Sequence, residues 1–188
     1  MPSPDGRSEE GSWRLLNPLS IRFSQPRIAP HFRDGHLLVD TSAEVEVKPF
    51  KEGGGEELLL SDPASAPDYD CIILPPFPSI RVISFMPKIR RSDGEAERNE
   101  RGDQVLGQRA WFALDNRRLY LLQQAAAAVW PKRCCAAVKC LEEVPGSTAR
   151  ELRKFRTTTE GRTVEIGARF GDDMIPWDWQ AGDLHLNK

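Results

Sequence analysis

The chain has 188 residues, of which 39% are hydrophobic and 29% are charged, and its formal net charge is −2 with a pI near 6.0. This length allows one hydrophobic core with at most a small satellite element, and the composition is typical of a soluble globular protein. Because the net charge is close to zero, the chain as a whole has no excess of positive charge to attract nucleic acid, and any basic binding surface would have to be a local patch. No run approaches the roughly 20 apolar residues that a membrane span needs.

The amino-terminal residues contain no apolar run of the kind that a secretory signal needs, so we expect a cytoplasmic or nuclear protein. The chain has four cysteines and no C-x-x-C pair, and the spacing of its three histidines does not complete a zinc site, so no metal site is predicted. Free thiols are the expectation for a reducing compartment. Cys134 and Cys135 are adjacent and point to opposite faces of an expected strand, so at most one of them should be buried beside Cys140.

Composition divides the chain into three regions. Residues 1–18 predict a disordered polar tail, residues 19–170 a single folded domain, and residues 171–188 a carboxy-terminal arm that packs back onto it. Two flexible insertions interrupt the domain. The first, at residues 51–66, starts with a Gly-rich linker, and the second, at residues 88–108, is dense in charges of both signs.

The first predicted elements are strands. Residues 19–25 alternate Leu, Ile and Phe with polar residues, which indicates a strand with one buried face, and residues 43–48 alternate in the same way. The prolines that precede Ser79 argue against a central strand there. Residues 80–85 then alternate again and predict a strand beside residues 111–114.

A central helix is predicted from Asn116 to Val129. Leucine, alanine and valine recur at three- and four-residue steps, as one buried helical face requires, and the alanine run favours a helix. Pro131 ends the helix, because the residue before a proline avoids helical geometry. Residues 134–141 alternate and predict a strand, so that strand, helix and strand would form a right-handed βαβ unit.

The remaining patterns are shorter. Residues 148–154 predict a short helix, and a Glu-Gly pair predicts the turn of a β-hairpin that joins residues 155–159 to residues 162–166. Two tryptophans in residues 174–179 are expected to pack back onto the domain. Together the elements predict an α+β fold, a single domain with a small mixed sheet and a central helix.

The start of the predicted helix is the strongest candidate site. Asp115 lies at the strand-to-helix corner, where we expect a side-chain oxygen of Asp115 or Asn116 to cap the helix, and Asp115 is also a weak candidate for catalysis. Arg117 and Arg118 lie in the first turn, where the helix dipole disfavours cations but the free N–H groups favour an anion. Two interpretations stay open: the arginines hold a phosphate or another anion, or they pair with acidic neighbours such as Asp115. No common catalytic or phosphate-loop motif occurs.

The same residues carry a resemblance to a known superfamily. Ile80-Arg-Val82 and the corner Phe112-Ala-Leu-Asp-Asn-Arg-Arg-Leu-Tyr resemble the ParB/sulfiredoxin superfamily, in which one strand carries I-x-V and a second ends in a short basic turn where a helix begins. More closely, the chain resembles an uncharacterised ParB-like group. This likeness rests on the Leu-Asp-Asn-Arg-Arg-Leu corner and on three short matches, Arg22-Phe-Ser-Gln, Phe32-Arg-Asp-Gly and Phe155-Arg-Thr-Thr, and it spans most of residues 19–166 outside the two insertions.

The resemblance implies a ParB/sulfiredoxin-like fold and a phosphate contact at the corner. The ligand it implies is a nucleotide, with Mg²⁺ as an accompanying ion, or another phosphorylated molecule. Asn116 stands about where sulfiredoxin has its catalytic cysteine, so sulfiredoxin's reductase chemistry is not expected. The hypothesis places the following residues at the phosphate: Arg22, Ser24, Gln25, Asn116, Arg117 and Arg118.

Two other classes of function stay open. One is a metal-dependent nuclease or phosphodiesterase, in which Asp115 would hold a divalent metal and the arginines the scissile phosphate. The other is a non-catalytic protein-interaction module that would present Trp177 and Trp179 to a partner. Whether the chain is an enzyme is therefore open, with nucleotide hydrolysis and nuclease-like cleavage as the reactions to test. Net charge does not support nucleic acid as the partner, and no membrane partner is expected.

Overall fold

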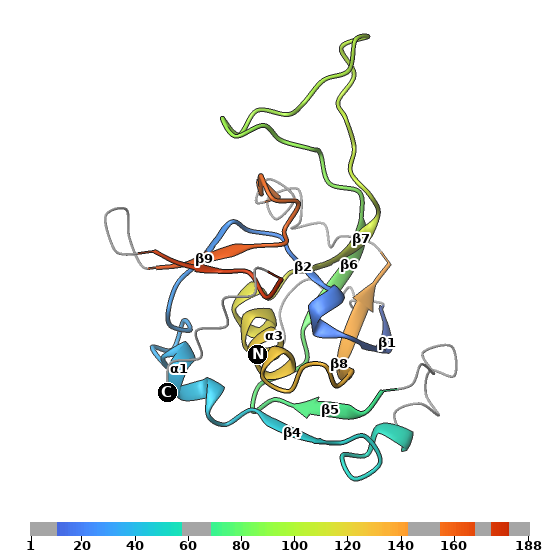
Figure 1. Ribbon diagram of the computed structural model, residues 1–188, viewed down its shortest axis with the longest axis vertical. Coiled ribbons are helices and arrows are strands. Elements are labelled where there is room, and N and C mark those ends of the chain that lie inside the picture. The colour runs from blue at the N-terminus through green and yellow to red at the C-terminus, as the bar shows by residue number, and fades with distance from the viewer. Residues whose placement is uncertain (1–10, 58–68, 143–154, 168–173, 181–188) are drawn as a thin grey trace, which may run out of the picture.

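A computed structural model describes residues 11–57, 69–142, 155–167 and 174–180, and its elements are organised around one helix (Figure 1). That helix, α3, runs from Asn116 to Ala128, within one residue of the predicted end. Its buried side chains include Leu119, Leu122 and Ala126, the apolar face that the sequence predicts. In the described part of the chain, two sheets and the helix α1 (Leu38–Ser42) surround it. The α+β class, the single domain and the mixed sheet with a central helix are confirmed.

Among the residues that the structure describes, the larger sheet has seven strands, both parallel and antiparallel. Six of them follow the order β2-β7-β6-β8-β5-β4, and β1 pairs with β8. The antiparallel pairing of β6 with β7 confirms the predicted neighbours, and β8 matches the predicted strand at residues 134–141. The strands are β1 (Gly11–Leu16), β2 (Arg22–Phe23), β4 (Glu46–Pro49), β5 (Cys71–Leu74), β6 (Arg81–Phe85), β7 (Ala110–Ala113) and β8 (Cys134–Leu141).

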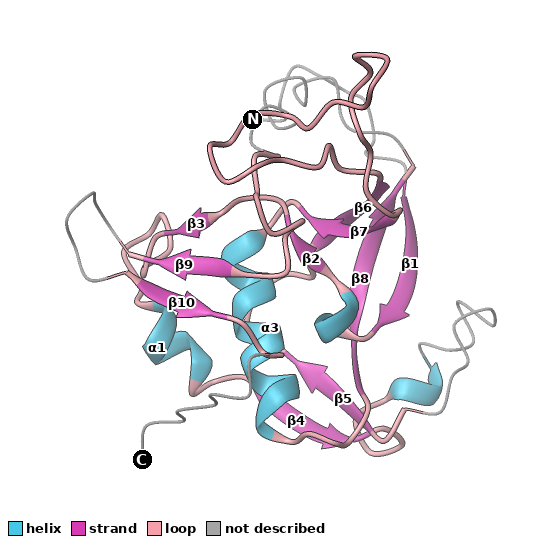
Figure 2. Cartoon of the chain, turned by 45° about the horizontal axis from the view of Figure 1, so that its top comes forward, coloured by secondary structure: helices cyan, strands magenta, loops and turns pink. Residues whose placement is uncertain are grey.

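The smaller sheet lies on the other side of α3 (Figure 2). Its strands are β3 (Arg27–Ile28), β9 (Val164–Ile166) and β10 (Ile175–Trp177), with β9 between the other two. The indole N–H of Trp177 donates to Gln123 Oε1 on α3 at 3.0 Å, and its ring meets Tyr120 edge-on with centroids 5.3 Å apart. The described residues of the expected carboxy-terminal arm therefore pack onto α3.

The amino-terminal part differs from the expected tail. Residues 11–16 form β1, which pairs antiparallel with β8, so the part of the expected tail that the structure describes belongs to the large sheet. Leu15 is buried beside Ile72 and Cys135. This strand was not predicted because residues 11–16 show no regular alternation of polar and apolar side chains. The strand is held by its pairing with β8, which lies far away in the sequence. Next, the predicted strand at residues 19–25 is reduced to β2, after the short 3-10 helix η1 (Pro18–Ser20).

Two predictions about the large sheet are wrong. A central strand does precede Ser79: β5 pairs with both β4 and β8, and the prolines follow the strand and end it instead of interrupting it. The unit β7-α3-β8 is also not a βαβ crossover. Strand β6 lies between β7 and β8, antiparallel to the first and parallel to the second, so β7 and β8 run in opposite directions.

The predicted hairpin at Glu160 is correct only in its turn. Glu160 and Gly161 both adopt positive φ, 52° and 76°, and Gly161 packs so closely on the Phe23 backbone that a Cβ has no space. The segments on either side do not pair with each other, because β9 pairs with β3 and β10 instead. The predicted helix at residues 148–154 lies outside the described residues. So do residues 58–66 of the first insertion, whereas residues 51–54 form turns after β4 and residues 55–57 are helical.

Both adjacent cysteines of β8 are buried, but on opposite faces of the strand, which confirms the expectation that at most one of them is buried beside Cys140. Cys134 packs in the main core together with Cys140, whereas Cys135 packs on the opposite face of the sheet with Leu15 and Ile72. The sheet is covered on both faces at β8, so alternation along the strand does not separate inside from outside. Burial is also the largest cause that raises the pKa of each of these two thiols to about 12.

The second insertion is an ordered excursion between β6 and β7, which we call the charged loop (residues 87–107; Figure 1). It contains two successive turns of the same kind, in which Arg90 Nη1 donates to Gly94 O at 2.7 Å and Arg98 Nη1 donates to Gly102 O at 2.6 Å. Both glycines have φ of 84°. Backbone hydrogen bonds among residues 89, 97 and 105 join the two turns to the stem. The expectation of a loosely held insertion fails because turn geometry and backbone bonds, not apolar side chains, order it.

None of the described helices is both long and apolar enough to cross a membrane.

Candidate functional site

The candidate site begins at the corner between β7 and α3. Asp115 occupies the position just before the helix, with φ −106° and ψ 63°, but its carboxylate makes no capping hydrogen bond to the helix. Instead Oδ2 accepts from the Arg81 backbone N at 2.9 Å and from Arg81 Nε at 3.1 Å, and Oδ1 accepts from Arg81 Nη2 at 3.0 Å. The expectation that Asp115 caps α3 is therefore wrong, because Arg81 takes both of its oxygens.

The first turn of α3 is consequently left without a side-chain cap. Helices leave the N–H groups of their first turn without a partner inside the helix. Among the described residues, no acceptor is found for the backbone N–H groups of residues 116–118, whereas Leu119 N donates to Asp115 O at 3.0 Å. These three donors and the positive end of the helix dipole lie together at the corner.

Arg117 and Arg118 are held by aromatic rings and by one backbone carbonyl. Arg117 Nη1 donates to His31 O at 2.7 Å, and its Cζ lies 5.9 Å from the centroid of the Phe32 ring. Arg118 Cζ lies 5.9 Å from the centroid of the Phe77 ring. In the described part of the chain, neither guanidinium forms an ion pair with a carboxylate. Cation–π contacts fix a guanidinium without neutralising it, so both groups keep their full charge.

Asn116 and Ser24 bind each other and fix the start of the helix. Ser24 N donates to Asn116 Oδ1 and Asn116 Nδ2 donates to Ser24 Oγ, both at 2.8 Å, and both side chains are buried. Strand β2 runs parallel to β7, which brings Ser24 to this place. The hypothesis places both residues at the phosphate, whereas their side chains hydrogen-bond to each other. The two side chains use their polar groups on each other, so they position the site.

A cleft of about 590 Å³ opens in front of this corner. Its walls are the start of α3, the start of β6, and the segment that runs from β2 through β3 to residue 34. Gln25 lines it, as the hypothesis requires, and Phe32 provides an aromatic wall. Five arginines and two aspartates line the cleft: Arg27, Arg33, Arg81, Arg117 and Arg118, with Asp34 and Asp115.

Arg22 does not join this cleft. Its Nη1 lies 3.2 Å from Glu160 Oε2, and Arg22 lines a separate hollow of about 210 Å³ that Arg162 and Trp179 also line. The same Glu160 carboxylate lies 2.9 Å from where a Cβ on Gly107 would be, at the base of the charged loop. The hypothesis that places Arg22 at the phosphate is therefore corrected: Arg22 does not line the cleft, and its side chain pairs with Glu160 instead.

The phosphate hypothesis did not include three of the cleft's arginines or its aromatic wall. Arg81 stands between Ile80 and Val82 of the I-x-V motif, and both of these neighbours are buried. Alternation along a strand therefore predicts that the Arg81 side chain lies on the face opposite to theirs. Arg27 and Arg33 lie in a segment without regular periodicity. Arg27 Nε is 2.8 Å from Glu165 Oε2 on β9, a pairing that depends on the small sheet.

Chemically, the cleft offers hydrogen-bond donors and positive charge but few acceptors. No group of three or more His, Cys, Asp or Glu side chains is arranged to hold a metal ion among the residues that the structure describes. Asp34 and Asp115 are the cleft's carboxylates, and both oxygens of Asp115 accept from Arg81.

Comparison with known proteins adds no family. No model of a protein family matches the chain, and searches of curated proteins and of solved structures find no match. The ParB/sulfiredoxin resemblance therefore stays a prediction, which rests on the residues of the corner.

Proposed function

We propose that the cleft at the start of α3 binds a phosphate-bearing anion, such as a nucleotide. The observation that carries this proposal is the diversion of Asp115 to Arg81. This pairing removes the carboxylate that would otherwise cap the helix, and it leaves Arg117 and Arg118 without an acidic partner among the described residues. An anion in the cleft would meet the donors that the fold leaves unused.

The contacts available in the cleft, a helix N-terminus and hydrogen bonds from arginine, are strong enough to bind an anion. A helix N-terminus stabilises a neighbouring anion by about 0.3–1 kcal/mol, and hydrogen bonds to charged groups contribute about 1.5–3 kcal/mol each. Arginine also suits phosphate because its planar guanidinium can donate two parallel hydrogen bonds. Small-molecule sites usually have volumes of roughly 300–1,000 Å³, and the cleft, at about 590 Å³, lies within that range.

The two alternative functions gain less from the geometry. A metal held by Asp115 would have to displace Arg81 from both carboxylate oxygens. An interaction module that presents Trp177 and Trp179 needs free tryptophans, but Trp177 packs on Tyr120 and Trp179 lies 5.8 Å from Trp130 between ring centroids. A plasmid-nicking assay with and without EDTA tests the first alternative, and EDTA-sensitive nicking would revive it.

Calorimetric titration of CTP and ATP tests the proposal. We expect the native protein to bind at least one of the two nucleotides and both Arg117→Ala and Arg118→Ala to weaken that binding by at least about tenfold, a loss of roughly 1.4 kcal/mol. Arg133→Ala is the matched control, because Arg133 also lies over an aromatic ring, 5.9 Å from the Tyr69 centroid, but outside the cleft. Equal binding by all four proteins, or no binding by any of them, would reject the proposal.

A further inference from the structure

We infer that the cleft is built for a terminal phosphate group, which carries two negative charges, in preference to a bridging phosphodiester, which carries one. This inference rests on the proposed function and narrows it to a class of ligand. It follows from the charges that stay unmatched in the cleft, from the position of the two guanidinium groups and from the number of donors.

The charges come first. Of the cleft's arginines, Arg81 is matched by Asp115, and Arg27 is matched by Glu165. Arg33 and Asp34 are adjacent, exposed and opposite in charge, so their fields largely offset each other at a distance in water.

Arg117 and Arg118 are what remains, and together they supply two positive charges that no described carboxylate balances. A phosphate monoester carries about −1.5 to −2 at neutral pH, since its second pKa is near 6. A terminal phosphate therefore balances this pair, whereas a phosphodiester leaves one charge unbalanced.

The two guanidinium groups are also supported by one aromatic pair. Phe32 lies under Arg117 and Phe77 lies under Arg118, and the centroids of these rings are 6.3 Å apart. Arg117 and Arg118, neighbours in the first turn of α3, therefore line one cleft on supports that lie beside each other. This placement suits a single small group with concentrated charge better than an extended backbone.

The number of hydrogen-bond donors in the cleft also favours a terminal phosphate. An arginine has five N–H donors, and Arg117 uses one of them on His31 O. Asn116, Arg117 and Arg118, which carry the remaining guanidinium donors and the backbone N–H groups of the first turn, all line the same cleft. A terminal phosphate offers three oxygens as acceptors, whereas a diester offers only the two that are not esterified. The surplus of donors therefore favours the terminal group.

CMP and 3′,5′-cyclic CMP provide a matched test, since they share base and sugar and differ in whether the phosphate is terminal. By calorimetry, we expect CMP to bind the native protein at least about tenfold more tightly than cyclic CMP, and we expect Arg118→Ala to remove most of that difference. Arg133→Ala should keep it. Inorganic phosphate and O-phosphoserine, titrated separately, distinguish the source: binding of both indicates that the phosphate alone is read, and binding of CMP only indicates a nucleotide.

The outcomes separate this inference from the proposed function. If cyclic CMP binds as tightly as CMP and Arg117→Ala weakens both, the phosphate cleft stands but the preference for a terminal group is overturned. If no phosphate compound binds the native protein, both fail.

Discussion

At the scale of single residues, the pairing of Arg81 with Asp115 decides what the corner can bind. The pair places the carboxylate beside the helix start yet prevents it from capping the helix. In this view Arg81 need not touch the ligand. By bonding to the Asp115 carboxylate, Arg81 keeps that carboxylate from accepting hydrogen bonds from the free N–H groups at the start of α3.

Arg81→Ala tests this role. The variant keeps the backbone N–H of residue 81 but removes both guanidinium bonds to Asp115. We expect the carboxylate, no longer neutralised, to add a negative charge beside the helix start, so that binding of CMP weakens by about tenfold or more. The double variant Arg81→Ala/Asp115→Ala should recover most of the affinity, because the competing carboxylate is gone. Thermal melts show whether each variant is folded. Unchanged CMP binding by folded Arg81→Ala would contradict the role.

The thiols of β8 give a second expectation for single residues. The pKa of Cys134 and Cys135 is raised to about 12, chiefly by burial, from an ordinary value of 9.0. Each thiol therefore holds its proton more tightly in the folded state. Its contribution to stability is present below the ordinary pKa and is lost as the pH rises from there towards the folded value.

At about pH 8 almost no thiolate forms at these two positions in the folded protein. We expect iodoacetamide to leave Cys134 and Cys135 unmodified in native buffer and to alkylate both in denaturant, as mass spectrometry of peptides can show. Rapid alkylation of the native protein at either position would show that β8 is less buried than described.

At the scale of elements, Gln123 connects three parts of the fold through α3. It is a buried polar residue: its Nε2 donates to Pro18 O at 3.1 Å and to Ile21 O at 2.9 Å, and its Oε1 accepts from Trp177. One side chain thus joins η1, α3 and β10. Leucine at this position would remove the partner of the Trp177 indole N–H and the side-chain donor to Ile21 O, while Pro18 O would keep the bond from the Ile21 backbone N–H.

We expect Gln123→Leu to lower the free energy of unfolding by about 2–4 kcal/mol, because each buried polar group left unpaired costs roughly 1–3 kcal/mol. Gln124→Leu is the matched control, since Gln124 makes a single side-chain bond to Tyr120 and is only partly buried. Its effect should stay below about 1 kcal/mol. Urea denaturation measures the free energy of unfolding of both variants. Equal losses would contradict the claim that the buried bonds of Gln123 stabilise the fold more than the bond of Gln124 does.

Elements with their own periodicity could be predicted from the sequence, and their partners could not. The leucine and alanine spacing of α3 and the alternation of β6 and β8 specify each element locally. The pairing of β1 with β8 and of β3 with β9 depends on backbone bonds between residues far apart in the chain.

The site divides in the same way. Two cations in a first helical turn are visible in the sequence, which is why Arg117 and Arg118 were found. The pairing of Asp115 with Arg81 and that of Arg22 with Glu160 depend on charges that meet only after folding, so the first was missed and Arg22 was misplaced.

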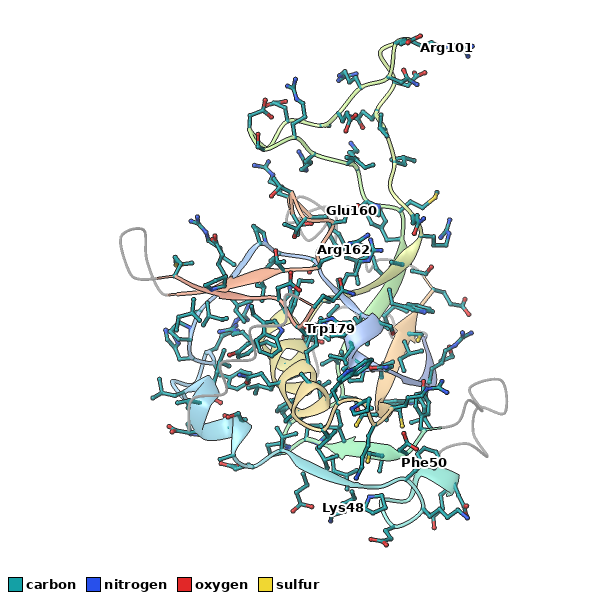
Figure 3. The ribbon with its side chains drawn as sticks, in the orientation of Figure 1. Lys48, Phe50, Arg101, Glu160, Arg162 and Trp179 are labelled. Atoms are coloured by element: carbon teal, nitrogen blue, oxygen red, sulfur yellow. The ribbon has the colours of Figure 1, made fainter. Side chains whose placement is uncertain are left out.

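At the scale of the whole molecule, the charged loop stands apart from the site. It extends from the large sheet, with Arg101 near its far end and Glu160 below its base (Figure 3). No residue of the loop lines the cleft. Its stem closes where Gly107 N donates to Pro87 O at 2.8 Å, next to the paired strands β6 and β7.

Replacing residues 88–106 with Asn-Gly should therefore leave the domain intact. A shorter loop loses less entropy on closure, so we expect the free energy of unfolding to stay constant or to rise by about 1 kcal/mol. Binding of CMP should not change. Loss of the fold, seen by circular dichroism, or loss of CMP binding would show that the loop supports the cleft.

The most direct measurement of the central claim is a set of proton–nitrogen correlation spectra of the labelled protein, recorded during titration with CMP. If an anion is bound at the uncapped start of α3, the backbone amide signals of residues 116–118 should shift most and in proportion to occupancy, while that of Arg133 stays in place. The account would be contradicted if CMP bound and those amides did not move, with the largest shifts instead at the hollow beside Arg22 and Arg162.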